Sequence, residues 1–500
     1  MNRRQFHRSV LAGLAGVALA PRLAQAAPTK PNILLFTADD LGPDTVGVNC
    51  LGGKVPGLTP NLDRFAAQGL RFTNAHVNSA ICVPSRGCLA TGRYGFHSGV
   101  YGFFKTDRPI PTVMETLHDA GYATGILGKV SHSTPKASIQ WDYAKDYAEL
   151  GCGRSPSLYH AACTEFLGQC KTSGKPFYFM VNSHDPHRPF QVGNKLLPHA
   201  EMPSRMHKPE EIHVPGYLPD LPGVRQELST YYNSVRRLDD TFGKVMQALE
   251  EAGFTENTLV MFLSDNGIAV PFSKCNCYLA STRTPWMARW PGVVKAGTVD
   301  DEQFVSGIDF FPTALDVVGL PIPKGLDGRS FLPVLKGQKQ EGRERVFTQI
   351  DYKAGGAAVP MRCVQDKEFG YIFNAWSDGK TTYHNANEGM CMAAMVKAAQ
   401  TDPAVAARVK TFRIRVAEEF YHLEKDPDCL ANLVGNPKYE KQLAAYQKQL
   451  RDWMVATGDP LLKAFDKRAD VRAMKAEMND SYLAACPRKS GRRKTPNKKK

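Results

Sequence analysis

Several features that define specialised classes of protein are missing from this 500-residue chain. There is no C-x-x-C pair, which argues against a structural zinc site, and the 12 cysteines are too sparse for a small disulfide scaffold. No internal repeat is present, and no apolar run beyond residues 1–26 is long enough to span a membrane. We therefore expect two or three globular domains with a large core, in which most cysteines are buried thiols.

Acidic residues are absent from both ends of the chain. The formal net charge is +14, but four arginines lie in residues 1–26 and eight lysines or arginines lie in residues 488–500. The rest of the chain is close to neutral, so the pI of about 9.1 does not indicate a nucleic-acid-binding protein. We expect the basic tail, residues 487–500, to be disordered because its like charges repel one another. Loose capture of a polyanion such as a sulfated glycan is the alternative.

Residues 1–26 resemble an export signal. Arg3 and Arg4 precede Phe6, an apolar run covers residues 10–20, and A-Q-A at residues 24–26 is a small-residue cleavage site. The paired arginines are similar to a twin-arginine signal, a route that carries folded cargo. The sequence therefore predicts a protein exported to the periplasm or the medium. An uncleaved anchor is the alternative.

The first two thirds of the sequence alternate short apolar runs with amphipathic segments. The runs are bounded by polar residues or glycine, as in strands buried on both faces. They cover residues 32–37, 123–127, 177–182 and 259–264. The amphipathic segments between them have apolar residues at helical spacing, and they cover residues 61–68, 112–120, 158–171 and 224–251. This order predicts an α/β fold with a mostly parallel sheet between layers of helices.

A smaller unit is expected after this α/β region. Residues 337–345 are charged and contain glycine, and they mark the boundary. Strands are expected at residues 346–350 and 370–374, followed by a long helix at residues 439–457. We therefore predict a catalytic domain over residues 27–340 and a C-terminal subdomain, an antiparallel sheet with helices, over residues 346–480.

Polar side chains follow two of the expected strands directly. Asp39 and Asp40 come after the first strand, and Asp265 and Asn266 come after the strand at residues 259–264. An open α/β sheet places its ligands at the carboxyl ends of its strands. Four oxygen donors that converge there suit Ca²⁺ or Mg²⁺. Either pair alone could be a turn or capping pair.

Residues 82–92 carry the most specific pattern. They read C-V-P-S-R-G-C-L-A-T-G and match C-x-P-S-R-x-x-x-x-T-G, so the chain resembles the type I sulfatases. The resemblance implies that Cys82 is oxidised to formylglycine, whose hydrate offers one hydroxyl to attack sulfur and another to expel sulfate. Pro84 suits the first turn of a helix, whose N-terminus and Arg86 would present donors to an oxyanion. The alternative is a buried thiol on a loop with a surface arginine.

The resemblance implies further site residues. Lys129 and His132 lie in G-K-V-S-H, His184 begins H-D-P-H-R-P, and Lys274 begins K-C-N-C-Y. In the family such residues bind the sulfuryl oxygens, through Lys129, Lys274 and Arg86, or carry protons, through His132, His184 and Lys274. The same family holds one Ca²⁺ beside the formylglycine. This Ca²⁺ site corresponds here to Asp39, Asp40, Cys82, Asp265 and Asn266.

The resemblance covers nearly the whole of residues 31–460. It is closest to the heparan N-sulfatase (sulfamidase) and iduronate-2-sulfatase-like members, and it implies an alkaline-phosphatase-like fold. The expected activity is hydrolysis of sulfate esters or sulfamates of sulfated carbohydrates, after maturation by a formylglycine-generating enzyme. Three alternatives remain open: a phosphonate or phosphate ester hydrolase of the same superfamily, a glycan-binding protein with unmodified Cys82, and a cysteine hydrolase. The oligomeric state, a homodimer included, also stays open.

Overall fold

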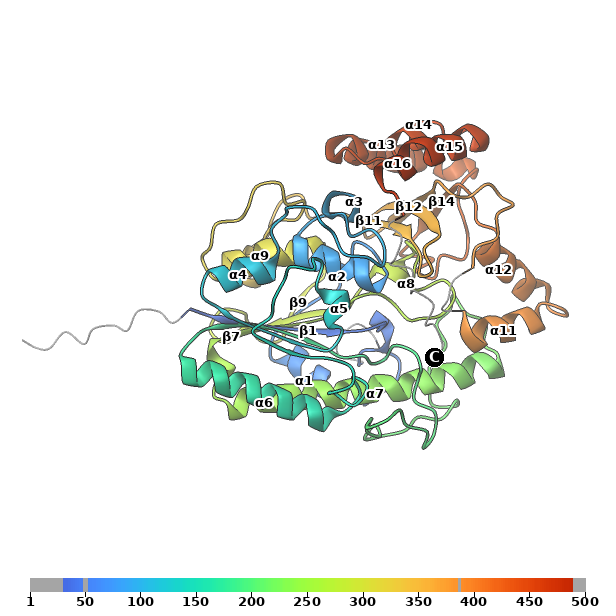
Figure 1. The fold of residues 1–500 in the computed structure, drawn as a ribbon. Helices are drawn as coiled ribbons and strands as arrows, with labels where there is room; N and C mark the ends of the chain where they lie inside the picture. The colour runs from blue at the N-terminus through green and yellow to red at the C-terminus, as the bar shows by residue number, and fades with distance from the viewer. Residues whose placement is uncertain (1–29, 48–52, 385–387, 489–500) are drawn as a thin grey trace, which may run out of the picture.

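The computed structural model describes residues 30–47, 53–384 and 388–488. The expected export signal, and all but two residues of the expected basic tail, lie outside these ranges. Within them, the central sheet has the order β5-β4-β6-β1-β7-β8-β2-β9 (Figure 1). Its strands are β1 (Asn32–Ala38), β2 (Leu70–Phe72), β4 (Ala123–Leu127), β5 (Tyr143–Lys145), β6 (Phe177–Asn182), β7 (Thr258–Ser264), β8 (Trp286–Arg289) and β9 (Thr298–Asp300). A separate pair is formed by β3 (Ala75–His76) and β10 (Val305–Ser306).

The five strands from β5 to β7 run parallel, and β8 is antiparallel to both of its neighbours. Strand β1 lies between β6 and β7 in this parallel part and is buried along its whole length. Its side chains alternate between the two faces of the sheet, because successive residues of a strand point to opposite sides. Leu34 and Phe36 join one hydrophobic cluster, and Ile33 and Leu35 join the other.

Helices cover both faces of the central sheet (Figure 1). One layer contains α1 (Pro60–Ala67), α6 (Pro156–Ser173) and α7 (Pro222–Glu251). The other contains α2 (Cys82–Thr91), α4 (Val113–Asp119) and α9 (Phe310–Val317). Short helices lie in the connections: α3 (Gly95–Ser98), α5 (Val130–Ser133), α8 (Leu279–Thr282) and α10 (Leu332–Leu335). The expected α/β architecture, with a mostly parallel sheet between helices, is confirmed.

The C-terminal unit is built on a four-stranded antiparallel sheet of order β11-β12-β13-β14. The strands are β11 (Val346–Tyr352), β12 (Ala358–Gln365), β13 (Phe369–Asn374) and β14 (Glu418–His422). Its helices are α11 (Gly389–Ala398), α12 (Pro403–Arg413), α13 (Glu440–Thr457), α14 (Leu462–Asp466), α15 (Val471–Glu477) and α16 (Leu483–Ala485). One hydrophobic cluster contains both Phe36 of the central sheet and Met361 of β12, so the two units share a core.

The cysteines of the described ranges are buried thiols, as expected for most of them. The eleven cysteines described are all buried, and none of them is in a disulfide. In the same ranges, no helix combines the length and the hydrophobicity needed to cross a bilayer.

Candidate active site

Helix α2 places Cys82 at its first position. The preceding residue, Ile81, has an extended backbone, and Pro84 lies in the first turn, where the missing N–H of proline costs no helical hydrogen bond. Gly92 ends the helix with a left-handed backbone at φ 63°, and its N–H donates to the carbonyl of Cys88 at 2.9 Å. Every residue of α2 is buried. The motif at residues 82–92 therefore forms one buried helix with its cap.

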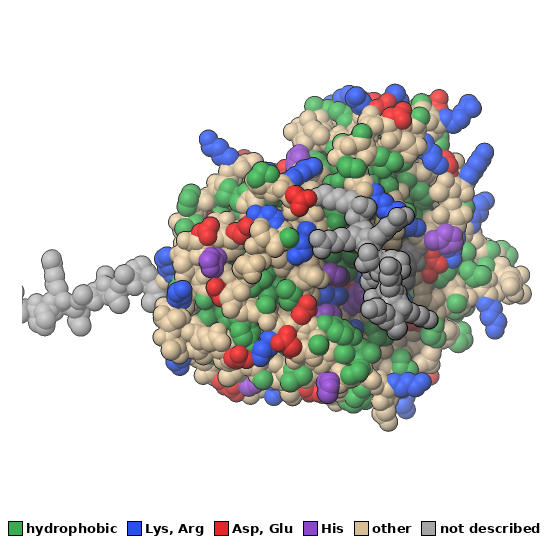
Figure 2. Space-filling view, in the orientation of Figure 1, with side chains coloured by type: hydrophobic (Ala, Val, Ile, Leu, Met, Phe, Trp, Pro, Cys, Tyr) green, Lys and Arg blue, Asp and Glu red, His purple; other side chains and the backbone are tan. Residues whose placement is uncertain are grey.

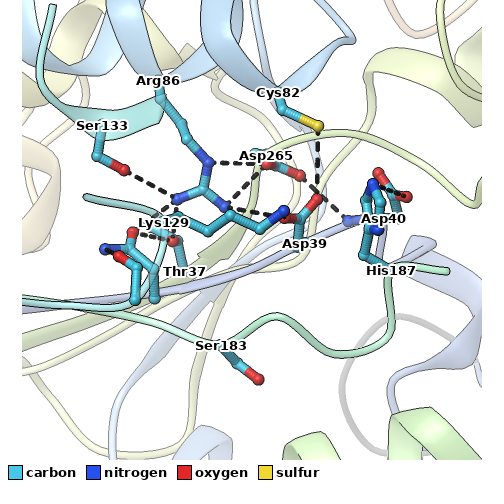
Figure 3. A network of polar contacts seen from close by, with 12 residues as sticks. Thr37, Asp39, Asp40, Cys82, Arg86, Lys129, Ser133, Ser183, His187 and Asp265 are labelled. Carbon is cyan, nitrogen blue, oxygen red and sulfur yellow. Dashed lines mark hydrogen bonds and ion pairs between the residues drawn. The ribbon is translucent and has the colours of Figure 1, made fainter. Parts of the chain in front are cut away.

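The carboxyl ends of β1 and β7 bring the expected metal-binding residues together beside Cys82 (Figure 3). The two strands are neighbours, so Asp39–Asp40 and Asp265–Asn266 leave the sheet side by side. The N–H of Asp40 donates to Oδ1 of Asp265 at 3.1 Å, and Nδ2 of Asn266 donates to Oδ1 of Asp40 at 2.7 Å. Cys82 Sγ lies 3.5 Å from Oδ1 of Asp39. The structure thus gathers all five residues, each fully or almost fully buried.

Two lysines reach this acidic cluster from opposite sides. Lys129, after β4, forms an ion pair with Oδ2 of Asp39. Lys274 forms an ion pair with Oδ1 of Asp40, and its Nζ lies 3.1 Å from Sγ of Cys82. Both ammonium groups therefore belong to the cluster that contains Asp39, Asp40 and Cys82.

Arg86 extends from α2 to the acidic cluster and is fully buried (Figure 3). Its Nε donates to Oδ2 of Asp265 at 2.9 Å, and its Nη2 is 2.8 Å from the same oxygen. Its Nη1 donates to Thr37, Ser133 and Asn182. Two nitrogens of the guanidinium therefore hold one carboxylate oxygen of Asp265 in place by a charge-assisted contact.

Charge compensation sets the protonation of these groups. Burial alone would raise the pKa of Asp39, but Lys129, His187 and Arg86 hold that pKa well below its usual range. Burial, and then neighbouring Asp39, raise the pKa of Asp265 to about 7. Burial would lower the pKa of Lys274, yet Asp40 raises it well above its ordinary value.

His187 joins the cluster although no role was expected for it. Its Nε2 lies 3.8 Å from Oδ2 of Asp40. One donor atom each of Asp39, Asp40, Cys82 and His187 lie within 4.8 Å of one another. The sequence contained the signal, because His187 is the second histidine of H-D-P-H-R-P, but only His184 was given a role.

The donor set fits a hard divalent cation. Carboxylate oxygens from Asp39 and Asp40 converge at one point, and such oxygens are what Ca²⁺ and Mg²⁺ prefer. Oδ1 of Asn266 is buried and accepts no hydrogen bond from the described residues. A buried oxygen without a partner is costly, and a cation would satisfy it.

The two predicted proton carriers lie on the β4 side of the cluster. His132 lies in α5, and His184 follows β6. Burial, and then Lys129, lower the pKa of His132 to about 4, and the same two causes hold the pKa of His184 well below its ordinary value. Nδ1 of each ring is buried and has no hydrogen-bond partner among the described residues. Both imidazoles are therefore neutral at pH 7. In the space-filling view, histidine and basic side chains gather in a recess of the face shown (Figure 2).

Comparison with known proteins agrees with this geometry. A family model described as Sulfatase matches residues 31–320. The chain belongs to the sulfatase family. A second model, described as N-sulphoglucosamine sulphohydrolase, C-terminal, matches residues 269–415 of this sulfatase. N-sulphoglucosamine sulphohydrolase of Homo sapiens is 30% identical over 473 residues, and the match covers 87% of this chain and 92% of the relative.

Solved structures with less than 25% identity have the same fold as this sulfatase. One is a protein in complex with its substrate D-glucosamine-2-N,6-O-disulfate, with a TM-score of 0.65 and 18% identity, covering 86% of this chain and 98% of that chain. Another is a phosphonate monoester hydrolase of Agrobacterium radiobacter, with a TM-score of 0.61 and 20% identity, covering 85% and 96%. The sulfatase is thus a hydrolase with the alkaline-phosphatase-like fold expected from its sequence.

Proposed function

We propose that this sulfatase hydrolyses sulfate esters or sulfamates of sulfated carbohydrates, using a formylglycine formed from Cys82 and one bound Ca²⁺. The observation that carries the proposal is the position of Cys82 Sγ, 3.5 Å from Asp39 and 3.1 Å from Lys274 at the start of a helix. A cysteine hydrolase would instead need a histidine in contact with the sulfur. Among the described residues, the hydrogen-bond partners of this sulfur are a carboxylate and an ammonium group.

The residues that would hold Ca²⁺ are Asp39, Asp40, Asp265 and Asn266, together with the modified side chain at position 82. The ion would neutralise charge on the sulfuryl oxygens and act as a Lewis acid. His187 stands at the edge of this set, 3.8 Å from Asp40.

Side chains of the protein bind the sulfuryl oxygens and transfer the protons. Lys129 and Lys274 bind the sulfuryl oxygens, because their ammonium groups flank Cys82 and are already held by Asp39 and Asp40. Such preorganised charge stabilises a transition state without reorganisation. Lys274, which is protonated, or His184, after it has taken up a proton beside the bound sulfuryl group, donates a proton to the leaving oxygen or nitrogen. His132 removes the proton of the second hydroxyl at position 82, and sulfate leaves.

Carbohydrate is the proposed substrate class. A sulfated glucosamine is the substrate in one structural neighbour, and the relative from Homo sapiens is named for N-sulphoglucosamine.

We also propose export by a twin-arginine route, because of Arg3 and Arg4, with a formylglycine-generating enzyme as the maturation partner. N-terminal sequencing of the exported protein tests the route, and Met1 as its first residue would contradict cleavage.

Two measurements test the chemistry. Mass spectrometry of the peptide that contains residue 82 should show that the thiol sulfur and two hydrogens have been replaced by one oxygen. A paired assay with aryl sulfate and aryl phosphonate should show preference for the sulfate. Cys82→Ala should abolish turnover of both and leave the fold intact. Preference for the phosphonate would favour the phosphonate hydrolase, and an intact thiol would favour a binding protein without catalysis.

A further inference from the structure

Exposed aromatic side chains are rare among the residues that the structure describes, and the two that occur there lie at the active site. Among the described residues, only Phe103 and Tyr147 combine an aromatic ring with high exposure, at 43% and 42%. Every other described phenylalanine, tyrosine and tryptophan is buried or half-buried. A single exposed apolar residue needs no explanation, but two that share one location do.

Each exposed ring packs against one of the predicted proton carriers. The ring of Phe103 lies 5.9 Å from the His132 ring at an interplanar angle of 86°. The ring of Tyr147 lies 5.1 Å from the His184 ring at 68°. Both histidines have Lys129 as an electrostatic neighbour. The two aromatic rings therefore pack against two histidines that share Lys129, the lysine that would bind the sulfuryl oxygens, as a neighbouring charge.

The sheet order places these rings to one side of the reacting group. Tyr147 follows β5, Lys129 and His132 follow β4, and the acidic cluster follows β1 and β7. Strands β5 and β1 are three strand spacings apart, about 14 Å. Phe103 belongs to a loop that is tied to the same side, because the N–H of Thr106 donates to the carbonyl of Pro135 at 2.8 Å.

We propose that Phe103 and Tyr147 form a saccharide-binding subsite that holds the sugar on the leaving-group side of the scissile bond. The C–H face of a pyranose ring stacks on an aromatic ring, and the polar cluster binds only the sulfuryl group. The backbone at Tyr147 is fixed for this role, because its carbonyl accepts a hydrogen bond from the N–H of Gly153 at 3.1 Å. This inference rests on the proposed function, since it requires a carbohydrate substrate.

The test separates binding of the sugar from binding of the sulfuryl group. Titration calorimetry on the full chain with Cys82→Ala measures affinity for two probes, a sulfated glucosamine-containing disaccharide and inorganic sulfate. Phe103→Ala and Tyr147→Ala should each raise the Kd of the disaccharide about 2- to 10-fold. The Kd of inorganic sulfate should not change. Phe103→Tyr and Tyr147→Phe keep a ring and should restore disaccharide binding.

Val299→Ala is the matched control. Val299 is 42% exposed like Tyr147, but it lies on β9, at the opposite edge of the central sheet. It should change neither Kd. If both alanine variants bind the disaccharide as tightly as the parent protein, or lose sulfate equally, the subsite is overturned. If the parent protein binds sulfate but no sulfated disaccharide, the proposed carbohydrate function fails, and the subsite fails with it.

Discussion

Arg415 Nη1 donates a hydrogen bond of 2.6 Å to Oδ1 of Asn276, and this bond joins the C-terminal unit to the segment that carries Lys274. Asn276 Nδ2 in turn donates to the carbonyl of Lys274 at 3.2 Å. Glu419 holds the guanidinium of Arg415 by an ion pair, and all of these residues are buried. Arg415 is therefore a positioning residue that acts through Asn276 on Lys274.

Arg415→Lys keeps the charge beside Glu419 but removes the donor to Asn276. We expect kcat/KM to fall about 10- to 100-fold, because a small displacement of a binding group is costly. Asn276→Ala should have the same effect, and the double variant should be no worse than either, with a coupling energy of about 0.5 to 3 kcal/mol. Kinetics and thermal unfolding of the four proteins check this.

Arg468→Lys is the control for the Arg415 variants. Arg468 also pairs with a glutamate of the C-terminal unit, Glu418, at 3.3 Å, but this pair is partly exposed. Arg468→Lys should leave kcat/KM unchanged. A lower melting temperature for Arg415→Lys with unchanged kcat/KM would mean that Arg415 supports the fold alone.

Ca²⁺ should stabilise the folded protein, because the acidic cluster exists only when β1 and β7 pair. At a Ca²⁺ concentration 100 times the Kd, the gain is about 2.7 kcal/mol, which thermal unfolding can measure. Asp40→Asn should remove most of the gain. Asp119→Asn is the control, because it changes a carboxylate whose side chain is 83% exposed. This variant should still be stabilised by Ca²⁺. A melting temperature that Ca²⁺ does not raise in the parent protein would contradict the site.

His97 should make stability depend on pH. A hydrogen bond that His97 Nδ1 donates to Asp327 raises the pKa of His97, although burial opposes this. Nε2 donates to the carbonyl of Thr457 at the end of α13, 2.8 Å away. A raised pKa means that the folded state binds the proton more tightly than the unfolded state. The stabilisation is complete below the unfolded pKa of about 6.5 and is lost as pH rises through the folded pKa.

His97→Gln should therefore cost up to about 1 kcal/mol at pH 5 and much less at pH 8.5. Denaturant unfolding across this range measures the difference. His118→Gln is the control, because the His118 side chain is 53% exposed and should show a much smaller effect. An equal loss for His97→Gln at both ends of the pH range would contradict the protonation model.

Gly153 allows His184 to occupy its position. The backbone at Gly153 is left-handed at φ 67°, and a Cβ there would overlap the imidazole of His184. Gly153→Ala should displace His184 and lower kcat/KM about 100-fold. Gly168→Ala is the matched control, since nothing lies within 4 Å of its Cβ position in α6. Gly168→Ala should stabilise the protein by up to about 1 kcal/mol and leave kcat/KM unchanged. If the two variants have equal kcat/KM, His184 has no role in catalysis.

The sequence predicted the central sheet well, because each buried parallel strand is a continuous apolar run. It predicted β11 and β13 but not β12 or β14. Pro360 and Arg362 interrupt the apolar pattern of β12, and Arg362 is buried only because Asp351 and Asp459 pair with it. Such compensation between residues far apart in sequence leaves no local signal. The strands β2, β5, β8 and β9 are too short to stand out from their turns.

Some residues of the candidate site could be predicted from the sequence and others could not. Residues at strand ends, such as Asp39 and Lys129, were predictable because a strand and its polar end are adjacent in sequence. His187 was not assigned, because its contact with Asp40 depends on the path of the chain after β6. Arg415 was missed because its partner, Asn276, lies in another unit. The roles predicted for His132 and His184 stay predictions, which the variants above test.

The burial of α2 sets an order of events during biosynthesis. Cys82 is 2% exposed, and the residues around it are enclosed between the central sheet and the rest of its layer. An enzyme that oxidises the Cys82 side chain must bind several neighbouring residues in its own active site. These residues cannot enter another active site while they are packed in a buried helix. We therefore expect the oxidation to happen on the nascent or still unfolded polypeptide. A chain that folds too early would be locked in an inactive form.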